Sequence, residues 1–144
     1  MGKTAIYCGF FDPYHIGHHH VYQQAKEVFG DVTVVIANNL AKKRHYPIAQ
    51  TAVQIEQATG NVVIWDGLIG DFCKEYGATY LVRGLRSHAD FAYEEGVAKI
   101  NEAIYPDIKT VYFRAKNDGV SSTLIRLLES HGKDVSMYLP NIER

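Results

Sequence analysis

Cysteine is scarce in this sequence, and long apolar runs are absent from it. Its 144 residues include two cysteines, Cys8 and Cys73, without CxxC spacing, which argues against a disulfide framework and a cysteine-based zinc site. No stretch of 18 apolar residues occurs, and the first residues show no apolar signal segment, so we expect neither a membrane span nor secretion. We therefore expect a cytoplasmic protein in a reducing compartment.

A strong charge of one sign is also missing. The formal net charge is −1, so attraction for anionic ligands must come from locally clustered lysines and arginines. This balance makes duplex nucleic acid a poor partner. Hydrophobic residues make up 47% of the chain and charged residues 22%, which is typical of a globular protein. With no linker, low-complexity tract or internal repeat, residues 1–144 are expected to form one domain.

The chain instead shows a regular alternation of strand-like and helix-like segments. Residues 4–8 and 32–37 are continuous apolar runs, and apolar residues between them recur at helical spacing. Continuous apolar strands favour a parallel sheet covered on both faces. Further strands are predicted over residues 61–65, 79–83 and 110–113, and helices over 47–59, 68–76, 91–105 and from 121 onward. The pattern predicts an α/β protein with a Rossmann-like, doubly wound, five-stranded parallel sheet.

Polar residues gather directly after four of the predicted strands. These segments are residues 9–18, 38–44, 83–90 and 116–123. In an open parallel α/β sheet, ligands bind in the crevice beyond the carboxyl ends of the strands. We therefore expect the four segments to meet at one edge of the sheet and to form the ligand site.

The first of these segments ends in His-Ile-Gly-His at residues 15–18, where a helix is predicted to start. A glycine there lets a ligand approach the backbone, and a helix N-terminus offers N–H groups to a phosphate. A lone histidine in a turn more often faces water, but this context favours phosphate chemistry. A zinc site that includes His19 and His20 is disfavoured, because adjacent helical side chains diverge and no acidic or thiolate partner lies at ligand spacing.

Together the segments resemble those of the HxGH nucleotidyltransferases, most closely the bacterial phosphopantetheine adenylyltransferase family. The resemblance runs nearly end to end and is carried by Gly-x-Phe-Asp-Pro at residues 9–13, Arg-Gly-Leu-Arg at 83–86, Asp-Phe-x-Tyr-Glu at 90–94 and Ser-Ser-Thr at 121–123. It implies transfer of AMP from ATP to 4′-phosphopantetheine, with Mg²⁺, to give dephospho-coenzyme A and pyrophosphate. It also implies a homo-oligomer, which is a hexamer in the family.

The resemblance implies roles for individual residues as well. The catalytic set would be His18, which stabilises the α-phosphate in the transition state, with His15, Lys42 and Arg86. The acceptor would be bound by Phe10, Lys42, Ile69 and Arg83. ATP would be bound by Phe10, Phe11, His18, Gly84, Leu85, Arg86, Glu94, Asn117, Asp118, Gly119, Val120, Ser121, Ser122 and Thr123. No metal-ligating residue is assigned.

The residue types suit this chemistry independently of the resemblance. Transfer at an α-phosphate develops negative charge on phosphate oxygens and on the departing pyrophosphate, so it requires cations and hydrogen-bond donors. No Ser-His-Asp or Cys-His arrangement is apparent in the sequence. We therefore expect the acceptor phosphate to attack directly, without a protein nucleophile.

Several of these residues have simpler interpretations. The basic residues 42–44 could form a solvated loop. Asp90 and Glu94, four residues apart, could share a metal or repel each other, and Asp90 could complement a helix N-terminus. Ser121 and Ser122 could serve only as a helix N-cap, since capping and phosphate binding use the same N–H groups.

Two positions depart from the family pattern. Phe10 stands where a small hydroxyl residue is usual, and His15 stands where the family usually has threonine. Both support an alternative function, nucleotidyl transfer to another phosphorylated acceptor such as nicotinamide mononucleotide. A second alternative is a nucleotide-binding module without catalysis, against which the intact His18 and Arg86 argue.

Overall fold

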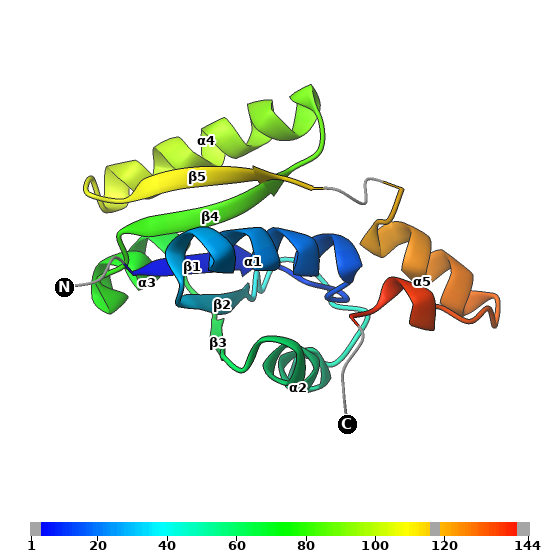
Figure 1. Ribbon diagram of the computed structural model, residues 1–144. Coiled ribbons are helices and arrows are strands. Elements are labelled where there is room, and N and C mark those ends of the chain that lie inside the picture. Colours follow the sequence, from blue (N-terminus) through cyan, green and yellow to red (C-terminus); the bar gives the residue numbers. More distant parts are fainter. Residues whose placement is uncertain (1–3, 116–118, 141–144) are drawn as a thin grey trace.

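The computed structural model describes residues 4–115 and 119–140. Five parallel strands form one sheet, as predicted, and their order is β3-β2-β1-β4-β5 (Figure 1). The strands are β1 (Ala5–Gly9), β2 (Val32–Ala37), β3 (Val62–Trp65), β4 (Tyr80–Leu85) and β5 (Lys109–Arg114). The helices are α1 (Ile16–Phe29), α2 (Ile48–Thr59), α3 (Ile69–Tyr76), α4 (His88–Ile104) and α5 (Ser122–Ser130), followed by the short 3₁₀ helix η1 (Ser136–Tyr138).

The strand register sorts the apolar residues onto the two faces of the sheet. Tyr7 on β1 pairs with Val34 on β2 and Val82 on β4, and all three lie in one core cluster with residues of α1 and α2. The alternate β1 residues Ile6 and Cys8 belong to a second cluster with residues of α3. The central strands therefore bury both faces, which is why their sequences read as continuous apolar runs.

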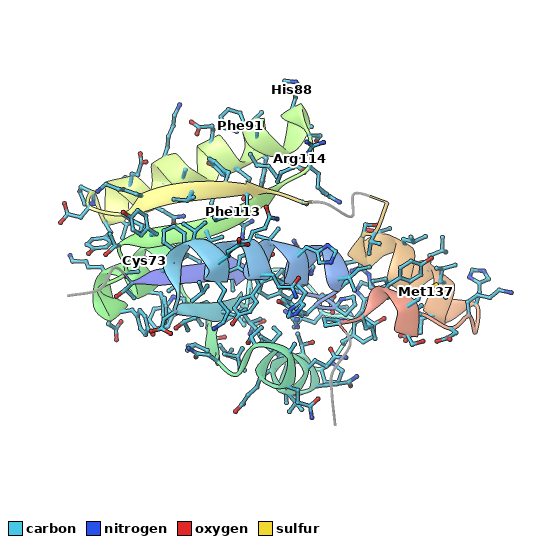
Figure 2. All side chains as sticks on the ribbon, viewed as in Figure 1. Cys73, His88, Phe91, Phe113, Arg114 and Met137 are labelled. Atoms are coloured by element: carbon cyan, nitrogen blue, oxygen red, sulfur yellow. The ribbon has the colours of Figure 1, made fainter. Side chains whose placement is uncertain are left out.

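Side chains fill both sides of the sheet, and Figure 2 labels one member of each layer. Phe113 on β5 packs against the first cluster, whereas Cys73 on α3 belongs to the second. Both cysteines are buried and free. Val28 of α1 is 64% exposed, whereas Phe29 beside it packs against the first cluster.

The helices begin and end close to the predicted positions. Pro47 is the N-cap of α2, and Gly60 ends that helix with a φ of 83°, a left-handed conformation that glycine adopts without steric cost. Strand β4 runs two residues past its predicted end, because Gly84 and Leu85 continue to pair with β5. No helix within residues 4–115 and 119–140 is long and apolar enough to span a membrane.

Helix α5 and η1 stand apart from the sheet, beside the start of α1 (Figure 1). They carry a small apolar cluster of their own, formed by Val120, Ile125 and Val135 and joined by Ile16 of α1. The chain therefore places the N-termini of α1 and α5 near each other, at the carboxyl edge of the sheet.

Candidate active site

A cavity of about 710 Å³ lies at the carboxyl edge of the sheet, within the size range of small-molecule sites. Residues from all four polar segments line it, so the structure brings together segments that are far apart in the chain. Among the residues implied by the resemblance, the lining includes Phe10, Phe11, His15, His18, Lys42, Arg83, Gly84, Arg86, Glu94, Val120, Ser121, Ser122 and Thr123.

Two imidazoles occupy the turn between β1 and α1, that of His15 buried and that of His18 half-buried. His15 is the N-cap of α1, and its Nδ1 accepts a hydrogen bond from the backbone N–H of Gly17 at 3.0 Å. The backbone N–H of His15 in turn donates to Nδ1 of His18 at 3.1 Å. The two rings stack with their centroids 3.7 Å apart. Because both Nδ1 atoms accept from backbone N–H groups, each neutral ring must carry its proton on Nε2.

Burial keeps both imidazoles uncharged. It lowers the pKa of His15 from 6.5 to about 4, with a smaller contribution from the nearby Arg86 cation. The pKa of His18 is also lowered well below its usual value, by burial first and then by His15, Arg83 and Arg86. At neutral pH the turn therefore offers two neutral Nε2–H donors rather than imidazolium cations or general bases.

The side chain of Arg83, on β4, makes hydrogen bonds through all three of its guanidinium nitrogens. Its Nε lies 2.5 Å from Oε1 of Glu94, its Nη2 donates to Oε2 at 3.0 Å, and its Nη1 donates to the carbonyl of Cys8. The Glu94 side chain is only 5% exposed. The resemblance implies that these two residues bind different substrates, whereas the structure pairs them with each other at the floor of the cavity.

Arg86 makes a more exposed ion pair with Asp90. The Asp90 carboxylate accepts from the Arg86 backbone N–H at 3.0 Å and from its Nε at 3.1 Å. Asp90 also lies in the first turn of α4, whose N-cap is Ser87. Each acid of the Asp90 and Glu94 pair thus engages its own arginine, and in the described residues no group of three or more His, Cys, Asp or Glu is placed to hold a metal ion.

The basic segment after β2 borders the cavity, and its two lysines are exposed. Lys42 and Lys43 line the cavity, and the Nζ of Lys42 lies 4.8 Å from the centroid of the Phe10 ring. Arg44 instead turns inward and donates to the carbonyls of Phe10 and Phe11 at 2.8 and 2.7 Å. Phe11 has a φ of 52°, a left-handed conformation that costs a residue with a Cβ about 1–2 kcal/mol.

The N-terminus of α5 also lines the cavity. Ser121 is the N-cap and accepts from the backbone N–H of Leu124 at 3.1 Å, so the capping interpretation of this residue is right. Ser122 donates to the carbonyl of Pro13 at 3.3 Å, and Arg126 donates to the carbonyl of Asp12 at 2.6 Å. Helix α5 is therefore attached to the turn that precedes the histidines.

Some residues implied by the resemblance lie elsewhere. Ile69 begins α3 and packs against the second core cluster, outside the cavity lining. Leu85 ends β4 and Gly119 lies exposed before α5, and neither is part of the lining. Asn117 and Asp118 fall outside the described residues. Gly84 lines the cavity but also has a packing reason: a Cβ there would meet Cγ2 of Val21 at 2.8 Å.

Sequence reasoning gave no role to several residues at the site: Asp12 and Arg126 line the cavity, and Arg44 supports the turn beside it. Asp12 is 3% exposed and accepts from the backbone N–H groups of His45 and Tyr46. Burial raises its pKa, but those hydrogen bonds outweigh burial and the net pKa is lowered. The available signal was an acid between apolar neighbours, since a buried charge needs partners.

A parallel sheet whose carboxyl edge combines two helix N-termini, paired imidazole donors, lysines and arginines defines an α/β protein of the nucleotidyltransferase class. A family model described as cytidylyltransferase-like matches residues 6–128. The chain therefore belongs to the cytidylyltransferase-like family.

Individual relatives agree with this membership. A phosphopantetheine adenylyltransferase of Cytophaga hutchinsonii is 36% identical over 97% of this chain and 98% of its own length. A solved structure described as a candidate nicotinate-nucleotide adenylyltransferase from Vibrio parahaemolyticus has a TM-score of 0.68 at 23% identity, over 98% of this chain and 95% of its own.

A lipopolysaccharide core biosynthesis protein from Thermoplasma volcanium has a TM-score of 0.56 at 18% identity, over 79% of this chain and 96% of its own. At these identities the two structural likenesses concern the fold alone.

Proposed function

We propose that this protein is an adenylyltransferase that moves AMP from ATP to 4′-phosphopantetheine and yields dephospho-coenzyme A and pyrophosphate. The observation that carries the proposal is the pair of neutral imidazoles at the start of α1, whose Nδ1 atoms are occupied by backbone N–H groups. Their Nε2–H groups are donors fixed in place before the ligand arrives. Such preorganised donors stabilise charge that develops on a phosphate during transfer.

The proposed reaction needs no protein nucleophile. An oxygen of the acceptor phosphate attacks the α-phosphorus of ATP, a new P–O bond forms, and the bond between the α-phosphorus and the oxygen that bridges to the β-phosphate breaks in line with it. Pyrophosphate leaves with that bridging oxygen and its electron pair. Catalysis then rests on positioning and on electrostatic stabilisation, as in phosphoryl transfer generally.

Different groups of the cavity lining suit the two substrates. Lys42 and Phe10 line the cavity, which supports their proposed role in binding the acceptor. Arg86 and the N-terminus of α5 with Ser122 and Thr123 also line it and offer a guanidinium and backbone N–H groups to the phosphates of ATP. His18, in the same lining, would serve the α-phosphate.

Magnesium enters the proposal with ATP rather than as a resident metal. The residues that the structure describes provide no cluster of three or more metal-ligating side chains, so they do not build a dedicated cation cage. Mg²⁺ usually keeps several waters and binds through substrate phosphates together with few protein groups. When it is bound to ATP, it neutralises charge on the phosphates.

The choice of acceptor rests on the 36% identical relative, which is named a phosphopantetheine adenylyltransferase. One observation favours a second candidate acceptor: Phe10 lines the cavity at a position where the family usually has a small hydroxyl residue. An aromatic ring cannot donate to the acceptor phosphate as a hydroxyl does. Transfer to another phosphorylated acceptor, such as nicotinamide mononucleotide, is therefore the second proposal.

Pyrophosphate release tests both proposals. The purified protein is incubated with ATP, Mg²⁺ and one acceptor at a time, and phosphopantetheine should give the fastest release. His18→Ala should lower turnover by about 100-fold or more, the usual loss for a transition-state donor. His19→Ala is the matched control, because the neighbouring His19 imidazole stacks on Tyr22 and is not part of the cavity lining.

Each result of that experiment has a distinct meaning. Faster release with nicotinamide mononucleotide would replace the first proposal by the second. Tight ATP binding without turnover on any phosphorylated acceptor would overturn both and leave a nucleotide-binding module. A cytoplasmic location and assembly into a homo-oligomer, both expected from the sequence, remain predictions that fractionation and light scattering can test.

A further inference from the structure

The turn of residues 10–13 and the loop of residues 42–46 bind each other through reciprocal hydrogen bonds. From the turn, the Asp12 carboxylate accepts from the backbone N–H of His45 through Oδ2 at 2.9 Å and from that of Tyr46 through Oδ1 at 3.0 Å. The Nδ1 of His45 lies 3.2 Å from the same Oδ2. Both carboxylate oxygens are therefore engaged by the loop.

From the loop, Arg44 returns two hydrogen bonds to the turn. Its Nη1 and Nη2 donate to the carbonyls of Phe10 and Phe11 at 2.8 and 2.7 Å, and its guanidinium lies 4.4 Å from the Phe10 ring centroid. Arg44 is not among the residues that line the cavity. Its side chain therefore acts on the loop and the turn without facing the cavity.

A third element is attached to the same turn. Arg126 of α5 donates to the Asp12 carbonyl at 2.6 Å, and its Nη1 lies 4.0 Å from Oδ2 of Asp12. A more exposed bond links α5 to the loop directly, from the hydroxyl of Tyr46 to Oε1 of Glu129 at 2.7 Å. Asp12 thus binds the loop of residues 42–46 through its side-chain carboxylate and α5 through its backbone carbonyl.

We infer that Asp12 and Arg44 are positioning residues that together place Lys42 and Lys43 over the cavity for the acceptor phosphate. We use the name turn clasp for four of their hydrogen bonds: the two that Asp12 accepts from the backbone N–H groups of His45 and Tyr46, and the two that Arg44 donates to the carbonyls of Phe10 and Phe11. The inference rests on the proposed function, because it concerns the acceptor side of that same site. It adds two residues to which neither the sequence nor the family resemblance assigned a role.

The loop must position its lysines because their side chains are flexible, whereas Asp12 and Arg44 are fixed by hydrogen bonds. Lys42 and Lys43 are exposed, and an exposed lysine is a point charge on a flexible stem with little geometric preference of its own. Where its charge sits is decided by the backbone that carries it. The backbone of Lys42 donates to the carbonyl of Asn39 at 2.9 Å, and two residues beyond Lys43 the backbone N–H groups of His45 and Tyr46 anchor the loop through charge-assisted hydrogen bonds to the buried Asp12 carboxylate, which are the stronger kind.

Asp12→Asn tests the turn clasp while keeping the shape of the side chain. The amide nitrogen that replaces one carboxylate oxygen cannot accept, so one of the two loop N–H groups loses its partner. We expect the KM for the acceptor to rise about tenfold, since each 1.4 kcal/mol is a factor of ten. The KM for ATP should change by less than about threefold, because the Arg126 bond uses the unchanged carbonyl.

Two further variants keep the test informative if Asp12→Asn folds poorly. Arg44→Gln releases the loop from its own side and should raise the acceptor KM in the same selective way. Ile55→Val, in the fully buried core of α2 and outside the cavity lining, is the control for loss of stability. It should lower the denaturation midpoint while leaving both KM values unchanged.

Amide hydrogen exchange tests whether the turn clasp forms, and it does not depend on enzymatic activity. In the wild type the N–H groups of His45 and Tyr46 should be protected, and in Asp12→Asn they should exchange about tenfold faster or more. Unchanged exchange, an unchanged acceptor KM in both variants, or equal rises in both KM values would overturn the inference. A wild type without turnover on any acceptor would remove the proposed function alone, because the exchange measurement still tests the turn clasp.

Discussion

Replacing His15 by asparagine should make the stability of the protein less sensitive to acid. Burial lowers the pKa of His15 from 6.5 to about 4. As the pH falls below 6.5, the unfolded chain binds a proton at His15 that the folded chain does not bind until the pH approaches 4. Unfolding therefore takes up protons in this interval, and the free energy of unfolding falls with the pH.

The size of the effect follows from these two pKa values. Above pH 7 the His15 ring is mostly neutral in the folded and the unfolded chain, so it adds almost nothing to the pH dependence of the free energy of unfolding. Between pH 7 and pH 5 the linkage relation assigns His15 a loss of about 2 kcal/mol, because one pKa unit corresponds to 1.36 kcal/mol. Asparagine does not titrate, yet its side-chain oxygen can accept the Gly17 N–H as Nδ1 does, and asparagine is a good N-cap.

Urea unfolding of wild type and His15→Asn at pH 7 and pH 5 measures this difference. The wild type should lose about 2 kcal/mol more than the variant over that interval, with any loss from His18 and His19 largely common to both. Between pH 7 and pH 8.5 the free energies of unfolding of wild type and His15→Asn should change with pH in the same way, because His15 is neutral there. Equal losses between pH 7 and pH 5 would refute the assignment of a buried, neutral imidazole to His15.

Two stability predictions concern the floor of the cavity. Glu94→Gln leaves the Arg83 guanidinium without its buried carboxylate and should destabilise the protein by about 3 kcal/mol in urea unfolding. Asp90→Asn removes the acid of a more exposed ion pair and should cost less than about 1 kcal/mol. Equal costs would contradict the argument that burial makes the Glu94 pair the more important one. Gly84→Ala would place a Cβ 2.8 Å from Cγ2 of Val21 and should cost about 1–3 kcal/mol. Adding Val21→Ala should recover part of that loss, and no recovery would mean that the strain lies elsewhere.

Much of the fold follows from the sequence because strands buried on both faces leave a clear pattern. The continuous apolar runs of β1 and β2 predicted their positions closely, and Gly60 ended α2 where expected. The end of β4 was less predictable, because Gly84 and Leu85 read as loop residues. They are strand because β5 lies alongside and pairs with them, and such pairing is a tertiary property that local sequence does not contain.

For the site, the sequence predicted which segments meet but not which side chains pair. Four polar segments follow strands, and parallel topology alone brings them to one edge. The ion pair of Arg83 and Glu94 joins residues 11 positions apart, and the hydrogen bonds of Asp12 and Arg44 join residues 33 or 34 positions apart. The composition and local pattern of the sequence do not indicate which of these side chains pair. Ile69 shows the opposite case, a residue implied by family position that the structure packs into the core.

The manner in which His15 is held explains how one family can use different residues at the same position. Its Nδ1 caps α1 and its Nε2 keeps a neutral proton, so the site uses it as an acceptor toward the backbone and a donor toward the cavity. A threonine hydroxyl, which the family usually has there, also accepts with one lone pair and donates one proton. In the proposed function, histidine and threonine would therefore meet the same hydrogen-bonding requirement at the start of α1.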